Sequence, residues 1–165
     1  MGVLDDLSAC AGAWQGTNRL HDPEIRAPED SPSKAVLTPL LGGRFFRLDY
    51  TWAFRGAPQE GSLLIGYDSA ADAVTAHWID TWHMTDKVMA CRGSVGTDGS
   101  ISVRGSYAAP SGPDWDWRTV IKPDRGRSLH LVMVNIDPEG REELAVEARY
   151  EKAPAKAGTE SRFEP

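Results

Sequence analysis

Cysteine is scarce in this sequence, and long apolar runs are missing from it. Cys10 and Cys91 are its two cysteines in 165 residues, too few for a disulfide framework, so we expect two reduced thiols. Residues 1–6 carry neither a basic region nor an apolar stretch, which argues against a secretory signal and a membrane span. The expectation that follows is a cytoplasmic protein without a membrane partner.

Motifs of the common enzyme classes are missing as well. The sequence contains no Gly-Lys-Ser/Thr phosphate loop and no Gly-x-Ser-x-Gly nucleophile elbow. Its histidines, cysteines and carboxylates show no zinc-like spacing, so we predict no bound metal. The formal net charge of -6 at pH 7 repels phosphate backbones and argues against nucleic acid as a partner.

The chain does have the composition of one globular domain. Its hydrophobic fraction of 41% and charged fraction of 25% are ordinary for a folded protein with a single core. Residues 1–152 are predicted to form that domain. Residues 153–165 are rich in Lys, Glu, Pro and Gly, with Phe163 as an apolar anchor, which is typical of a frayed tail.

Short runs rich in Val, Ile, Thr and aromatic residues alternate with turn residues along the chain. In residues 44–54, alternate positions are large and apolar while Arg47, Asp49 and Thr51 lie between them, the period-two pattern of a strand. Asp98-Gly99 between two such runs indicates a hairpin. One short helix is expected over residues 4–11. We expect about ten strands in all. They are predicted at residues 12–21, 34–41, 44–54, 62–67, 74–82, 87–94, 101–107, 115–121, 129–136 and 142–150.

Sequential strands joined by tight turns predict an all-β fold. We expect a closed antiparallel up-and-down barrel, because closure leaves no unpaired strand edge. A two-sheet sandwich is the alternative. A barrel of this size has room inside for a small ligand.

Several runs carry a resemblance to known barrels. GAWQGT at residues 12–17 resembles the opening signature of lipocalin-like, calycin-type barrels, a group that includes fatty-acid-binding proteins and nitrobindin. WIDTWHM at 78–84, GSY at 105–107 and WDWRT at 115–119 resemble a bacterial lipocalin-like family of unknown function, domain of unknown function 1579. The resemblance implies a ten-stranded barrel and no established activity.

Two finer expectations also come from the resemblance. Nitrobindin-type haem ligation needs a histidine on the closing strands, and no histidine follows His130, so we expect no haem and no other cofactor. In calycins a basic side chain of the last strand covers the first tryptophan. By this resemblance, Trp14 and Arg149 are predicted to form a cation–π contact worth about 1 kcal/mol.

Aromatic residues on the predicted strands are the candidate ligand-binding residues. Tyr50 and Trp52 share the apolar face of their strand, and Tyr107 and Trp117 are expected to join them in the interior. Aromatic walls with few polar groups are typical of pockets for small apolar or planar molecules. Ordinary core packing is the alternative.

The segment 74–82 carries the polar candidates. Trp78, Asp80 and Trp82 share one face by parity, and His83 falls on the other. We expect the tryptophan face to be inward, because two exposed tryptophans are costly. An inward Asp80 is then a candidate ligand anchor or general base. His83 near the following turn is a second candidate, with a surface position as its alternative.

The sequence leaves three functions open. The leading hypothesis is non-catalytic binding of a small apolar or aromatic molecule inside the barrel. The second is an isomerase or hydrolase-type enzyme that uses Asp80 or His83. The third is an interaction module that forms a homodimer, because both faces of residues 129–136 are apolar and either the N-terminal helix or a second subunit must cover the outer one.

Overall fold

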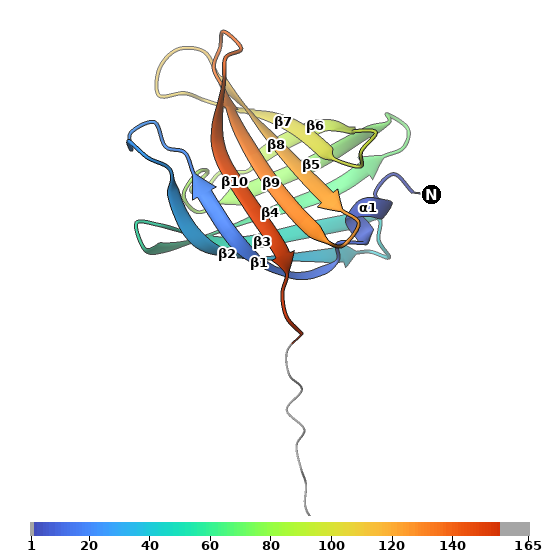
Figure 1. Ribbon diagram of the computed structural model, residues 1–165. Coiled ribbons are helices and arrows are strands. Elements are labelled where there is room, and N and C mark those ends of the chain that lie inside the picture. The colour runs from blue at the N-terminus through green and yellow to red at the C-terminus, as the bar shows by residue number, and fades with distance from the viewer. Residues whose placement is uncertain (1, 156–165) are drawn as a thin grey trace, which may run out of the picture.

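Ten antiparallel strands close into one barrel in the computed structural model, which describes residues 2–155 (Figure 1). The predicted all-β class, strand number and closed barrel are confirmed. Most of the predicted tail, residues 156–165, lies outside the described residues. The element bounds are α1 (Asp5–Ser8), β1 (Gly12–Leu20), β2 (Glu29–Leu40), β3 (Phe45–Phe54), β4 (Ala57–Asp68), β5 (Ala73–Asp80), β6 (Met89–Val95), β7 (Ile101–Tyr107), β8 (Trp115–Asp124), β9 (Ser128–Ile136) and β10 (Glu142–Lys152).

The strands run up and down in sequence order, and β1 pairs with β10 to close the ring. Because their directions alternate, the connections after the odd-numbered strands all lie at one end of the barrel, which we call the mouth. The β3–β4 connection there is the two-residue turn Arg55-Gly56, with φ values of 49° and 78°. Positive φ at both central residues suits the twist of a tight hairpin.

Strand β3 shows how the sequence pattern builds the core. Its alternate residues Phe46, Leu48, Tyr50 and Trp52 are each at most 5% exposed, whereas Arg47 between them is exposed. Complete burial of a large apolar side chain stabilises the fold by roughly 1.5–3 kcal/mol. The hydrophobic alternation therefore fixes which face of the strand points inward.

Helix α1 closes the end of the barrel opposite the mouth (Figure 1). Leu7 and Cys10 are buried, and the Trp14 indole Nε1 donates a 2.8 Å hydrogen bond to the Cys10 carbonyl oxygen. A Cβ built on Gly126, in the β8–β9 turn, would lie 2.9 Å from the Ala9 carbonyl oxygen. The chain just after α1 thus abuts that turn, and the helix region acts as a plug.

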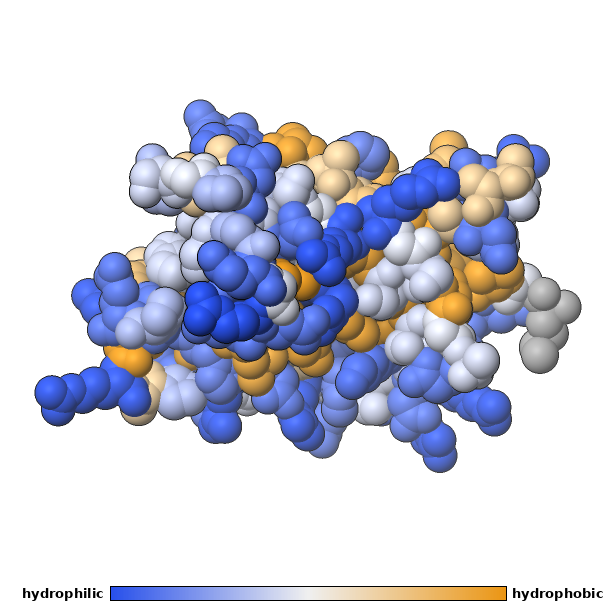
Figure 2. Space-filling model, turned by 90° about the horizontal axis from the view of Figure 1, so that it is seen from above, coloured by the Kyte–Doolittle hydropathy of each residue, from blue (hydrophilic) through white to orange (hydrophobic). Residues whose placement is uncertain are grey.

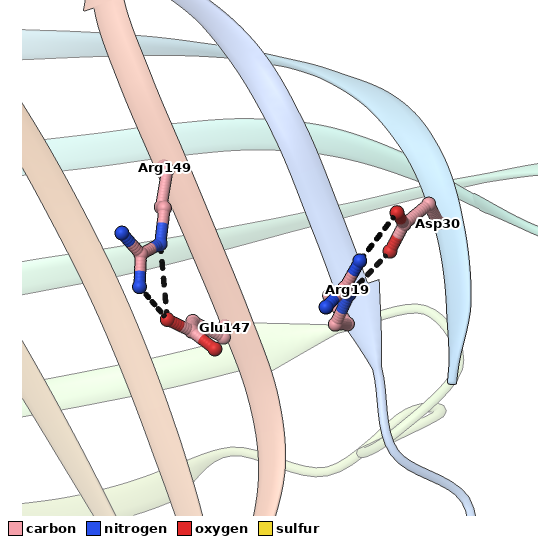
Figure 3. A network of polar contacts seen from close by, with 4 residues as sticks. All are labelled: Arg19, Asp30, Glu147 and Arg149. Atoms are coloured by element: carbon pink, nitrogen blue, oxygen red, sulfur yellow. Dashed lines mark hydrogen bonds and ion pairs between the residues drawn. The ribbon is translucent and has the colours of Figure 1, made fainter. Parts of the chain in front are cut away.

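The predicted contact between Trp14 and Arg149 was wrong. Tyr150 takes an inward position on β10, so its neighbour Arg149 points outward, with a side chain that is 67% exposed. Arg149 donates hydrogen bonds to Glu147 on the outer face, where Arg19 and Asp30 form a second ion pair (Figure 3). Trp14 is covered by α1 instead, as its hydrogen bond shows.

The outer face of β9 is covered largely by its neighbours in the sheet. Val132 is partly buried and Val134 is 9% exposed. Val134 lies opposite Arg118 of β8, and Arg118 forms an ion pair with Glu142 of β10. The aliphatic stem of a paired arginine is well suited to cover such a valine. Helix α1 lies at the end of the barrel and does not cover the outer face of β9.

Hydrophilic side chains project from much of the surface seen from above, with apolar ones between them (Figure 2). The outward apolar residues Val36, Leu64 and Ile79, on β2, β4 and β5, are each more than 40% exposed. Within the described residues, no helical segment has the length and apolar character needed to cross a bilayer.

Candidate functional site

The aromatic residues proposed as a pocket lining meet inside the barrel near its mouth. Tyr50 and Trp52 on β3, Trp78 on β5 and Trp117 on β8 are all 6% exposed or less. The rings of Trp78 and Trp117 stack with centroids 5.1 Å apart. Their inward orientation agrees with the strand parity. The rings pack against one another, however, so this part of the interior is largely filled by side chains.

Asp80, at the end of β5, is the buried acceptor at the centre of this cluster. Its Oδ2 accepts hydrogen bonds from the Tyr50 hydroxyl at 2.7 Å and the Trp52 indole at 3.3 Å. Its Oδ1 accepts from the backbone N–H groups of Trp82 and His83 at 2.9 and 2.8 Å. Four donors use the acceptor positions of a carboxylate. Asp80 therefore positions the turn that follows, and this arrangement leaves little acceptor capacity for a substrate proton.

A glycine allows Tyr50 to reach this carboxylate. Gly61 of β4 lies between the two residues in register, paired with Tyr50 on one side and Asp80 on the other. The Tyr50 ring crosses over Gly61, and its hydroxyl also accepts a 2.9 Å hydrogen bond from the Trp78 indole. A Cβ at position 61 would fall 2.2 Å from the Tyr50 hydroxyl. The lack of a side chain there is a structural requirement.

The placement of Trp82 and His83 by strand parity was wrong. Strand β5 ends at Asp80, and both residues belong to the turn that leads to β6. Thr85 in this turn has a φ of 56°, and the Met84 N–H donates to the Asp80 carbonyl oxygen at 3.1 Å. The alternation of side chains between the two faces of a strand does not continue through such a turn. Trp82 therefore does not share the face of β5 on which Trp78 lies. The turn brings both rings over the mouth.

His83 lies inside a box of four tryptophans. Its ring centroid is 5.4 Å from Trp52, 5.8 Å from Trp78, 4.8 Å from Trp82 and 5.2 Å from Trp117. The Trp52 ring is nearly parallel to the imidazole and the Trp82 ring is nearly perpendicular to it. His83 is therefore enclosed by aromatic rings on several sides while it keeps partial solvent exposure.

A small cavity of about 110 Å³ lies at the mouth beside this box. The rings of Trp82, His83 and Trp117 form one part of its wall, and Asn135 of β9 lies directly opposite Trp117 in register. Larger depressions of about 330, 450, 640 and 1060 Å³ also occur. Those of 450 and 1060 Å³ are lined mainly by outward side chains, although Tyr50 and Asp80 contribute to the first. We place the candidate site at the mouth because the inward aromatic residues gather there. The remaining lining residues are Leu20, His21, Asp22, Pro23, Glu143, Leu144 and Ala145.

The other proposed residues take different positions around the cavity. Tyr50, Trp52, Trp78 and Asp80 lie behind its wall, and Tyr107 also lies outside its lining. The Tyr107 hydroxyl donates a 2.5 Å hydrogen bond to Asn135 Oδ1 and so orients that side chain. The sequence-based candidates therefore divide into lining residues and residues that support them.

Several lining residues were missed from the sequence. Asn135 shares the inward parity of Leu131 and Met133, so a polar side chain on the core face of an apolar strand was an available signal. His21 and Ala145 carried no comparable signal. Ala145 sits at an irregularity of register between Leu144 and Val146, which only the paired strands reveal.

The site contains no recognisable metal centre. Within residues 2–155, no three His, Cys, Asp or Glu side chains are grouped so that they could hold an ion. His77, on the outer face of β5, is exposed. The polar side chains of the cavity lining are His21, Asp22, His83, Asn135 and Glu143.

Burial of His83 makes the stability of the barrel depend on pH. Burial lowers the pKa of His83, while Asp80 and then Asp22 act in the opposite direction. The folded state thus binds fewer protons at this ring than the unfolded state. Its contribution to stability is complete above the unfolded pKa, about 6.5, and is lost as the pH falls toward the folded pKa. We expect an added slope of up to about 1.4 kcal/mol per pH unit within that window.

Urea unfolding at pH values from 7.5 to 5.0 measures this slope. His83→Gln should flatten it, whereas His77→Gln, at an exposed position, should leave it unchanged. An unaltered slope in the His83→Gln protein would show that His83 is not the group responsible.

The fold and the site together define a class: a closed ten-stranded antiparallel barrel with an aromatic cluster and a small cavity at its mouth. Residues 5–152 match the family described as protein of unknown function (DUF1579), and the chain belongs to that family. No match was found among the curated proteins. The crystal structure of Rv2717c from M. tuberculosis is similar, with a TM-score of 0.60 and 17% identity over 93% of this chain and 99% of that chain. At this identity the likeness concerns the fold alone.

Proposed function

We propose that the barrel binds a small apolar or aromatic molecule at its mouth, against Trp82, His83 and Trp117. The observation that supports this most is the cavity itself, which has aromatic walls and a few polar groups. The deeper interior holds packed tryptophan and tyrosine rings, so the proposed ligand occupies the mouth and not the barrel centre. Asp80 and Tyr50 keep the wall rigid through the hydrogen bonds that hold the turn.

The size of the cavity limits the ligand to about one ring. An apolar protein cavity of about 150 Å³ holds benzene. This one has about 110 Å³ but opens to solvent, so a single ring would fill it and extend out of the mouth. Small ligands gain at most about 1.5 kcal/mol per non-hydrogen atom and usually far less. We therefore expect a simple ring compound to bind with a Kd of about 1 mM, equivalent to about 4 kcal/mol.

Titration with toluene tests the proposal. We expect quenching of tryptophan fluorescence and a rise in Tm, both saturating near the same concentration, because two of the lining residues are tryptophans. Ala145→Leu should abolish both signals, because the added side chain projects from a residue of the cavity lining.

Ala13→Leu is the matched control, since Ala13 is exposed on β1 and lies outside the cavity lining. This variant should bind toluene like the unaltered protein. Equal binding by the Ala145→Leu and Ala13→Leu proteins, or no binding by the unaltered chain, would refute the proposal.

A further inference from the structure

The indole of Trp117 has a buried hydrogen-bond donor without an acceptor. Trp117 is 6% exposed, and its Nε1 has no partner among the described residues. Indole nitrogen only donates, and an unmatched buried donor costs about 1–3 kcal/mol. The indoles of Trp14, Trp52 and Trp78 each have an acceptor within the protein. Trp117 differs from these three, and its ring lines the cavity at the mouth. Its Nε1 itself has almost no accessible surface, so a ligand reaches this donor only when a neighbouring side chain shifts.

A second donor lies across the strand pair from Trp117. Asn135 is its direct neighbour in register and also lines the cavity. Because Asn135 Oδ1 accepts the Tyr107 hydroxyl, the amide NH₂ is the group that remains for a ligand. A second buried nitrogen without a described partner, His21 Nε2, belongs to the same lining. His21 Nε2 can donate or accept and so fits either kind of ligand group, whereas the Trp117 indole and the Asn135 amide NH₂ can only donate and favour an acceptor.

The charges around the cavity argue against an anion as the source of that acceptor. Asp22 and Glu143 are among the described lining residues of the cavity, which include no lysine or arginine. One described cation, Arg26, lines an adjoining depression that shares Asp22 and Glu143. A carboxylate ligand would meet two like charges in this lining, and Arg26 lies outside it. Glu143 is exposed and Asp22 is partly exposed, so solvent weakens their attraction for a cation.

We infer that the ligand is an uncharged single-ring molecule whose carbonyl, amide or hydroxyl oxygen accepts a hydrogen bond from Trp117 Nε1. This assignment rests on the proposed function and adds the chemical class of the ligand. The ring packs against Trp82 and His83, and the acceptor faces Trp117 and Asn135. A ring without an acceptor fills the same space and leaves the indole donor unmatched.

Four probes of similar size test the assignment on the full chain: benzamide, toluene, benzoate and benzylamine. Their affinities are measured by calorimetry, and the indole N–H signals are followed by NMR. Benzamide should bind about tenfold more tightly than toluene, the effect of one net hydrogen bond, and more tightly than benzoate or benzylamine. It should also shift one indole N–H signal downfield, the signal that is absent from the Trp117→Phe protein.

Trp117→Phe keeps a ring and removes the donor, so the benzamide preference should fall to within about twofold. Trp82→Phe is the matched control, because Trp82 lines the cavity but its nitrogen is not a buried unpaired donor; the preference should persist there. If Trp117→Phe does not fold, the Trp117 indole N–H signal is assigned in the unaltered protein by its nuclear Overhauser contacts with the stacked Trp78 ring. A downfield shift of that signal by benzamide then supports the inference, and its absence overturns it.

The outcomes separate the two proposals. Equal binding of toluene and benzamide overturns the inference about the acceptor and leaves the proposed function standing. Tightest binding of benzoate or benzylamine overturns the uncharged class. Failure of all four probes to bind overturns both proposals.

Discussion

Asp80→Asn is expected to lower the free energy of unfolding by about 3 kcal/mol. The substitution keeps the shape of the side chain but turns one acceptor oxygen into an amide donor. In either orientation that amide faces two donors, the side chains of Tyr50 and Trp52 or the backbone N–H groups of Trp82 and His83. Each unmatched buried donor costs about 1–3 kcal/mol, and their costs overlap because the groups form one network.

Urea unfolding at pH 7.5 measures this loss, and Asp30→Asn is the matched control. Asp30 forms an exposed ion pair with Arg19, with both side chains roughly half exposed. Exposed pairs contribute at most about 1 kcal/mol, so the control should lose less than that. Similar losses in the two variants would mean that Asp80 does not hold the mouth together.

Gly61→Ala is expected to destabilise the barrel by about 2–3 kcal/mol. The new Cβ would meet the Tyr50 ring at 2.2–2.9 Å, so the ring must leave its place over position 61. Its hydroxyl would then lose Asp80 and the Trp78 indole, and the mouth turn would lose part of its support. Broadened tryptophan N–H signals in NMR spectra should accompany the loss of stability.

A double-mutant cycle identifies the cause of this loss. Tyr50→Leu removes the ring that the methyl group meets, so Gly61→Ala should cost less than about 1 kcal/mol in that background. An equal cost in both backgrounds would place the strain in the strand backbone and not in the Tyr50 contact.

Most of the barrel was predictable from alternation and turn chemistry. The predicted range 44–54 agrees with the observed strand β3 to within one residue. The agreement is close because large apolar residues at every second position define both the strand and its inward face. The predicted 62–67 was too short, since β4 begins at Ala57. Pro58 and Gly61 are typical of turns, yet here Pro58 lies opposite Ala53 in the sheet, and Gly61 makes room for a neighbouring ring.

The candidate site was less predictable because it depends on how a strand ends. Parity placed Tyr50, Trp78 and Asp80 on the inner face, where they are buried. The parity prediction failed from Trp82 onward because the chain leaves the sheet after Asp80. No local residue pattern indicated that the strand ends there. Trp117 and Asn135 become neighbours only through the register of β8 and β9. Such a pairing is a property of the assembled barrel.

Pairing of β1 with β10 places Trp14 opposite Lys152, so the first and last strands are neighbours although almost the whole chain separates them. Contacts between such distant segments carry the largest loop-closure entropy and tend to form slowly. During synthesis on the ribosome, β1 has only β2 as a partner until the final strand emerges. Because β10 is the last strand to be synthesised, the seam between β1 and β10 is the last strand pair of the ring that can form.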